Sequence, residues 1–131
     1  MISRIAGLMV ATAALLGVVT APAQAAVDPG CVPALNRPCA WHQVVSGGVA
    51  GSARIYAPTE DQLTVLRVDV RIERSWGAPW ETVASAVRVQ QGSFQLSTPA
   101  IATTGYLSMV CATGGPVGDV DLQGTFCTSP H

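Results

Sequence analysis

Lysine is absent from this 131-residue chain, and the positive charge comes from seven arginines, set against eight acidic residues. Charged residues make up only 11% of the sequence and aromatic residues 5%. Nucleic-acid-binding proteins present a basic patch, which a chain with a formal net charge of −1 and so few cations does not offer. The composition therefore argues against a nucleic-acid partner and gives no reason to expect an anionic membrane surface as a partner.

Local motifs of catalysis and cofactor binding are also missing. The chain has no nucleophile elbow, no phosphate-binding glycine loop and no pair of histidines at metal-binding spacing. Cys39 and His42 are close in sequence, but strand alternation would point their side chains to opposite faces. We therefore expect neither an enzyme nor a bound cofactor or metal, and a small hydrolase is the least favoured alternative.

Only one long hydrophobic run is present, and it lies at the start of the chain. Residues 5–19 are apolar apart from glycine and threonine, and Ala23-Gln24-Ala25 has the small residues that signal peptidase recognises. The run is shorter than the ~20 residues that cross a bilayer. We expect a secretory signal peptide at residues 1–25, one domain at residues 26–131, an extracellular location and no membrane attachment after cleavage.

The candidates for covalent crosslinks are four cysteines, Cys31, Cys39, Cys111 and Cys127. In an exported domain an even number of cysteines indicates disulfides, so we expect two bonds. The local pairs Cys31–Cys39 and Cys111–Cys127 are favoured, because each closes a turn-rich segment. Pairs that join the front of the chain to its end are the alternative, and the cysteine and histidine spacing fits no zinc finger.

No segment beyond residue 25 has a helical repeat of useful length. Apolar residues instead alternate with polar ones in short runs separated by Gly, Pro, Ser and Thr, which predicts β-strands. The strands are expected at residues 41–45, 49–57, 63–74, 80–90, 93–97, 104–111 and 119–128. About seven short strands favour an all-β fold, an antiparallel β-sandwich, and a small Greek-key barrel is the alternative.

The strongest alternation lies between Leu66 and Gln90. Leu66, Val68, Val70 and Ile72 are separated by charged residues, which predicts a strand with one buried and one solvated face. A four-residue loop at residues 76–79 would bring the valines of the return strand opposite this buried face. The predicted pairs are Leu66 with Val89, Val68 with Val87, Val70 with Ser85, and Ile72 with Val83.

The same register leaves five candidate ligand-binding residues on the solvated face or at the hairpin tip: Trp76, Trp80, Arg67, Arg71 and Arg88. A tryptophan offers a flat apolar face and one N–H donor, and arginine adds directional hydrogen bonds. The structural alternative is that Trp80 closes the end of the core and Trp76 stacks on a neighbouring arginine. We expect a monomeric, non-catalytic binding module whose ligand is a carbohydrate, a cell-envelope component or a protein.

A second functional hypothesis rests on the segment CVPALNRPC, residues 31–39. It contains two prolines between two cysteines, and a disulfide would make it a rigid exposed loop. A secreted inhibitor or effector that acts through this loop is therefore the alternative function.

The hairpin sequence RVDVRIERSWGAPWETVAS resembles hairpins of small exported proteins from GC-rich bacteria that have immunoglobulin- or fibronectin-like sandwiches. The resemblance covers about residues 65–89, together with the signal peptide and the number of cysteines. It implies a β-sandwich and no catalytic residues. Two features differ: Ser75-Trp76-Gly77 replaces a polar glycine turn, and Tyr106 lies five residues before Cys111 instead of the two that a tyrosine corner requires.

Overall fold

The computed structural model describes residues 34–103 and 105–131, which form an all-β structure. Its elements are β1 (Pro38–Val45), β2 (Gly48–Ile55), β3 (Leu63–Glu73), β4 (Glu81–Gln91), β5 (Phe94–Ser97), β6 (Leu107–Pro116), the single-turn 3-10 helix η1 (Val120–Leu122) and β7 (Gly124–Cys127). The seven predicted strands are all present, although several begin or end elsewhere. The expected signal peptide, residues 1–25, lies outside the described residues, as does Cys31.

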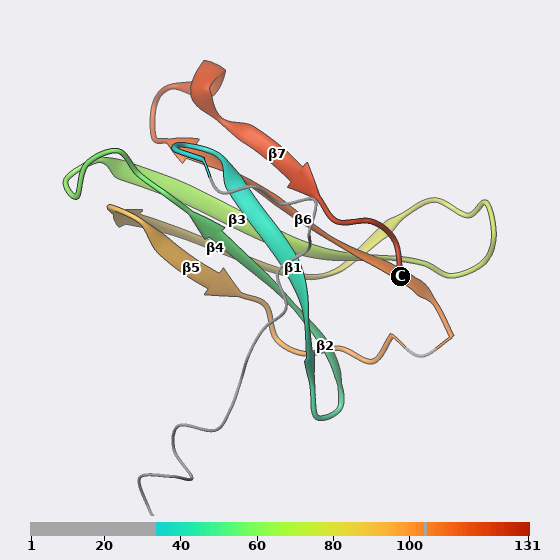
Figure 1. Ribbon diagram of the computed structural model, residues 1–131. Coiled ribbons are helices and arrows are strands. Elements are labelled where there is room, and N and C mark those ends of the chain that lie inside the picture. Colours follow the sequence, from blue (N-terminus) through green and yellow to red (C-terminus); the bar gives the residue numbers. More distant parts are fainter. Residues whose placement is uncertain (1–33, 104) are drawn as a thin grey trace, which may run out of the picture.

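The strands form two antiparallel sheets, with the orders β1-β2-β5 and β4-β3-β6-β7 (Figure 1). The two sheets pack on each other through a hydrophobic core to which both contribute. The three-stranded sheet supplies Ala40, Ala53, Ile55, Phe94 and Leu96, and the four-stranded sheet supplies Leu66, Val68, Val70, Val110 and Ala112. Most of these side chains are small or β-branched, which suits the narrow space between two pleated sheets.

Strand β3 has the predicted alternation. Leu66, Val68 and Val70 are fully buried and Ile72 nearly so, whereas Arg67 lies on the other face. The strand is central in its sheet, because β4 and β6 pair with its two edges. The buried face predicted from the sequence is therefore confirmed for β3.

The predicted register between β3 and β4 is wrong by one residue. Val65 pairs with Val89 and Arg67 with Val87, and an irregularity between Val70 and Arg71 shifts the pairing further toward the loop. Val87 and Val89, expected in the core, are 65% and 53% exposed. The loop is also longer than predicted, because β3 ends at Glu73 and β4 begins only at Glu81.

A buried carboxylate explains the register that the chain adopts. Asp69 is only 7% exposed, and a buried charge is costly unless hydrogen bonds compensate it. In the observed register Ser85 lies opposite Asp69, and its hydroxyl donates a hydrogen bond to Asp69 Oδ1. Ala84 and Ala86 then pack against the core in place of Val87 and Val89, whereas Val83 still contacts the core as predicted. Hydrogen bonding to Asp69 thus offsets the exposure of two valines.

Strands β6 and β7 are joined by the disulfide Cys111–Cys127, which confirms one of the two predicted bonds. The two cysteines are directly opposite each other in the ladder, with Cα atoms 4.1 Å apart. The Cys31–Cys39 pairing involves a residue outside the described ones. The predicted end of this strand at Cys111 is wrong, because β6 continues to Pro116, and the chain reverses between Pro116 and Gly124.

Candidate functional site

The loop between β3 and β4 displays Trp76 at the end of the hairpin. The N–H of Ala78 donates to the carbonyl of Ser75 at 2.9 Å, and Gly77 has a φ of 80°. A type II turn requires a positive φ at its third position, which glycine adopts without strain. Trp76 occupies the second position, is 94% exposed and lies in a loop that projects beyond the neighbouring loops (Figure 1).

An ion pair closes the base of this loop. Arg74 Nε donates to Glu81 Oε2 at 2.8 Å, and Arg74 Nη2 donates to Glu81 Oε1 at 3.3 Å. The hydrogen bond from Arg74 lowers the pKa of Glu81, and the hydrogen bond to the Glu81 carboxylate raises the pKa of Arg74. Both side chains are about half exposed, so the pair orients the loop more than it stabilises the fold.

Tyr106, from the segment that precedes β6, completes the site. The Arg74 guanidinium lies 5.5 Å from the centre of the Tyr106 ring, within cation–π range. β6 pairs with β3 as far as Leu107 opposite Glu73, and this pairing brings Tyr106 to the hairpin loop. We call Arg74, Trp76, Trp80, Glu81 and Tyr106 the aromatic tip.

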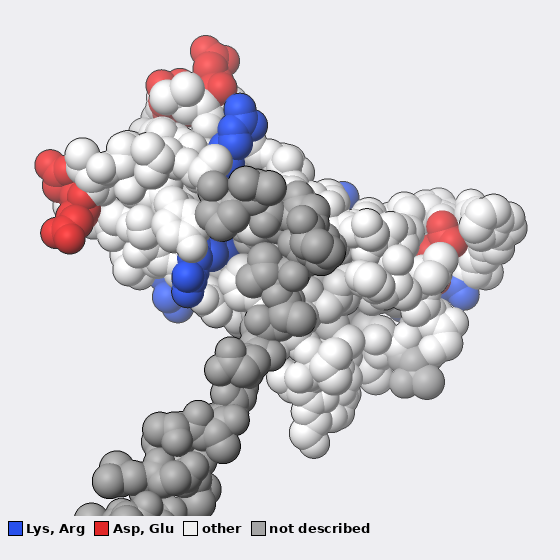
Figure 2. Space-filling model, in the orientation of Figure 1, with Lys and Arg blue, Asp and Glu red and all other residues white. Residues whose placement is uncertain are grey.

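Trp80 is less prominent than the sequence suggested. It is half-buried and directly precedes β4, not within the strand as predicted. Figure 2 shows acidic and basic side chains among uncharged surface at the end that carries the aromatic tip, whereas acidic side chains gather over the loops at the opposite end. A ligand at the tip would therefore meet one exposed indole ring beside the Arg74–Glu81 ion pair.

Sequence reasoning missed Tyr106 and Glu81 as members of the site. Glu81 carries a detectable signal, since it and Arg74 flank the two tryptophans and have opposite charges. Tyr106 has no such signal in the sequence, because its position depends on the pairing of β3 with β6, which are far apart in the chain. Only the sheet order brings these segments together.

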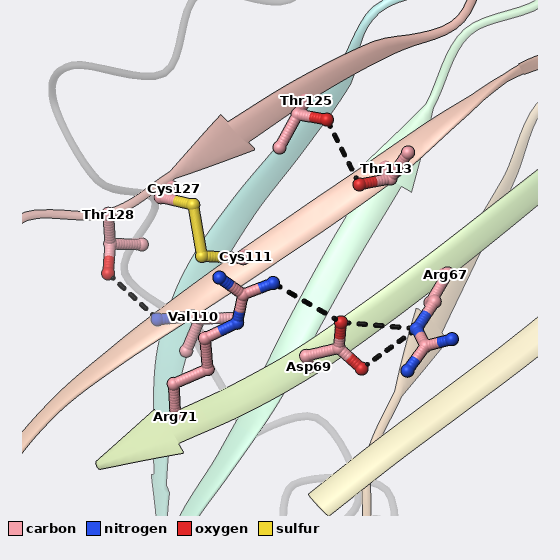
Figure 3. Close-up of a disulfide and its surroundings, with 9 residues drawn as sticks. All are labelled: Arg67, Asp69, Arg71, Val110, Cys111, Thr113, Thr125, Cys127 and Thr128. Atoms are coloured by element: carbon pink, nitrogen blue, oxygen red, sulfur yellow. Dashed lines mark hydrogen bonds and ion pairs between the residues drawn. A yellow bond between two sulfur atoms is a disulfide. The ribbon is translucent and has the colours of Figure 1, made fainter. Parts of the chain in front are cut away.

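The three arginines predicted to share a face do not all do so. Arg67 Nε donates to both carboxylate oxygens of Asp69, at 3.0 and 3.1 Å, and Arg71 Nη2 lies 3.9 Å from Asp69 Oδ2 (Figure 3). Asp69 therefore lies between Arg67 and Arg71 as their shared counter-charge. Arg88, however, pairs opposite the buried Leu66, not Arg67, which places it on the other face of the sheet.

His42 belongs to a second polar cluster, between the sheets. Its Nε2 lies 3.2 Å from the Ser108 hydroxyl, and its ring meets the edge of the His131 ring with centroids 4.8 Å apart. A serine beside a histidine is one part of a nucleophilic site. Ser108 is only 4% exposed, however, so its hydroxyl is not accessible to a substrate in this structure.

Of the 31–39 segment, the structure describes Ala34 and the residues that follow. The N–H of Asn36 donates to the carbonyl of Tyr56 at 2.7 Å, and Gln62 Nε2 donates to Asn36 Oδ1 at 2.8 Å. The N–H of Arg37 bonds to the carbonyl of Ala34, which closes a turn. Leu35 and Arg37 are exposed on this turn.

A shallow polar groove of about 440 Å³ lies at the end of β3 and β4 opposite the aromatic tip. It runs between the β2–β3 loop at Pro58–Glu60 and the β4–β5 turn at Gly92–Ser93. A neighbouring hollow of about 200 Å³ is lined by Arg54, Tyr56 and Gln95, among others, and shares Ser93 with the groove. The side chain of Arg54 is held by Gln95 Oε1 at 2.8 Å.

Within residues 34–103 and 105–131, no group of three or more His, Cys, Asp or Glu side chains is placed to hold a metal ion. That same part of the chain has no helix with the length and hydropathy needed to span a bilayer. No protein-family model matches the chain, and neither curated proteins nor solved structures include a match.

Proposed function

We propose that this chain is an exported, non-catalytic binding module that holds a carbohydrate ring against Trp76. The observation that carries the proposal is the 94% exposure of Trp76 on a loop whose base is held by Arg74, Glu81 and Tyr106. An exposed indole on an ordered turn is pre-organised for stacking, which reduces the entropy lost on binding. The carboxylate and guanidinium beside it suit the hydroxyl groups of a sugar.

A β-sandwich of the immunoglobulin or fibronectin type III kind is part of the same proposal. The order β4-β3-β6-β7 supports it, because β4 pairs with β3 and not with β5. In immunoglobulin constant-type sheets the fourth strand instead joins the sheet of the first, second and fifth strands. The order thus favours the fibronectin-like variant, in which loops at the two ends of the sheets serve as binding sites.

A sugar suits the narrow tip better than a folded protein does. Stable protein–protein interfaces bury about 800 Å² on each partner, which needs a broader surface than one projecting loop. A cell-envelope glycan that offers repeated rings would also allow several copies to bind at once. A protein partner remains the second candidate ligand.

The test is retention of the disulfide-intact protein on a glycan array that includes bacterial cell-wall polysaccharides. We expect Trp76→Ala to abolish retention with an unchanged melting temperature, because the side chain makes little contact with the fold. Val120→Ala, a change at another exposed apolar side chain, in η1, is the control and should bind as the wild type does. Equal retention of Trp76→Ala, or no retention of the wild type on any glycan, would overturn the proposal.

A secreted inhibitor or effector that acts through residues 31–39 is the alternative, and the ordered turn at Ala34–Arg37 favours it. An inhibitory loop must resist cleavage while it blocks its target. Pro38 follows Arg37, and trypsin does not cleave efficiently before proline, so digestion with the broad-specificity protease subtilisin, followed by mass spectrometry, is the test. Intact bonds across Ala34–Arg37, with inhibition of the protease, support the alternative. Rapid cleavage within Ala34–Arg37 excludes it.

A further inference from the structure

Four strands lie at the edges of the two sheets, and β4 offers the longest edge, whose one irregularity, at Val83, lies near the start of the strand. β5 and β7 have only four residues each, and β1 begins with Pro38. β4 has 11 residues and contains neither proline, glycine nor lysine. Within the described residues, no strand pairs with the outer edge of β4. Long edges without such protection are where another strand adds to a sheet.

The hydrogen-bond pattern identifies which backbone groups of β4 point outward. The N–H of Gly92 donates to the carbonyl of Gln62, which continues the ladder in which Leu63 pairs with Gln91. Bonded and non-bonded positions alternate along an antiparallel pair. Positions 84, 86, 88 and 90 therefore bond to β3, and Ser85, Val87, Val89 and Gln91 direct their N–H and C=O groups to the free edge.

Two of the four side chains at these positions, Val87 and Val89, are apolar. Val87 and Val89 are more than half exposed, on the same face as Ser85. The only charged residue between positions 82 and 91 is Arg88. A partner strand would therefore find free backbone groups, exposed valines and little charge.

We propose that β4 pairs with β4 of a second copy of this chain, antiparallel and centred on Val87, so that two four-stranded sheets become one eight-stranded sheet. A two-fold axis requires only that the edge be complementary to itself, which an antiparallel strand satisfies. This pairing joins the regular stretch 84–90 of both copies, with Val87 opposite Val87 and Ser85 opposite Val89. The sequence suggested a monomer, and this free edge is the reason to depart from that expectation.

Charge selects this register over its nearest competitor. Centring the pair on Arg88 would give an overlap of the same length, over residues 85–91. It would also place the two Arg88 side chains directly opposite each other, and like charges at opposed positions are destabilising. In the register centred on Val87, Arg88 instead faces Ala86 of the partner.

Sedimentation velocity over a wide concentration range tests the proposal. The sample is the full chain as its expression host exports it. The wild type should shift from monomer to twice the monomer mass as its concentration rises. Val87→Lys places two like charges at the axis and should raise the dimer dissociation constant about tenfold or more. Val120→Lys, the same change at an exposed site outside the strands, should leave the dissociation constant unchanged.

Charge complementation tests the predicted contact directly. Val87→Lys and Val87→Glu should each dimerise more weakly than the wild type, and their mixture should form a mixed dimer at concentrations where neither self-associates, because only the mixture places opposite charges at the axis. A wild type that stays monomeric at all concentrations overturns the proposal, as does a dimer that Val87→Lys does not weaken. Trp76→Ala should dimerise as the wild type does, so this result is independent of glycan binding.

Discussion

Asp69 is the residue on which the four-stranded sheet depends most for its polar contacts. It is buried on the face of the sheet that points away from the core, and it accepts hydrogen bonds from Arg67 and Ser85. Arg71 lies close enough to its second oxygen for an ion pair. The carboxylate therefore joins two strands and separates two arginines that would otherwise repel each other.

Replacing Asp69 with alanine should destabilise the fold by about 2 kcal/mol, the typical value for hydrogen bonds to a charged group. The change leaves the Ser85 hydroxyl without its acceptor and the two arginines without their counter-charge. Urea unfolding measures the free energy, with Asp121→Ala at an exposed position as the control. A loss no larger than that of the control would show that the buried carboxylate contributes little.

At the level of elements, the sequence predicts β3 well and β4 poorly. The alternation of Leu66 to Ile72 with charged residues is enough to assign both faces of β3, because the strand is long and central. β4 has apolar residues of both parities, so hydrophobicity alone allows two registers. The choice depends on the hydrogen bond from Ser85 to Asp69 and on a longer loop, and neither is visible in a hydrophobic pattern.

The aromatic tip was also predicted only in part, because some of its contacts are not visible in a hydrophobic pattern. Trp76 is recognisable because it stands before a glycine in a turn between two strands. The contribution of Tyr106 requires the sheet order, which joins β3 to β6. Residues that act within one hairpin can be identified from the sequence, and those brought together by distant strands cannot.

The ion pair at the tip predicts a pH dependence of the hairpin loop. The hydrogen bond from Arg74 holds the pKa of Glu81 below its ordinary value of 4.5. Because the folded-state pKa is the lower one, the contribution of the pair is complete above the ordinary value and is lost as the pH falls through the folded-state pKa.

NMR titration of the Glu81 side-chain carboxyl carbon measures this shift. The midpoint should lie below 4.5 in the wild type and return toward 4.5 in Arg74→Ala, which removes the hydrogen-bond donor. Glycan retention should fall over the same acidic range, since the loop then loses the contact that orients it. An identical midpoint in both proteins would show that Arg74 does not hold the carboxylate in solution.

At the scale of the whole molecule, the fold is built from pairings between distant segments. β2 pairs with β5 and β3 pairs with β6, so neither sheet can be completed by neighbouring hairpins alone. Distant pairings require long loops to close before the contacts form, which slows folding. The Cys111–Cys127 bond shortens only the connection between β6 and β7.

We therefore expect the oxidised chain to refold in milliseconds to seconds, in one exponential phase that ends with burial of Trp41. Trp41 is buried and Trp76 almost fully exposed, so a variant with Trp76 and Trp80 replaced by phenylalanine reports core formation by fluorescence. Stopped-flow refolding should start from briefly unfolded protein, so that proline bonds keep their native isomers. If the sheets instead assembled as separate hairpins, fluorescence and far-UV circular dichroism would give different rates, because backbone pairing would precede burial of Trp41.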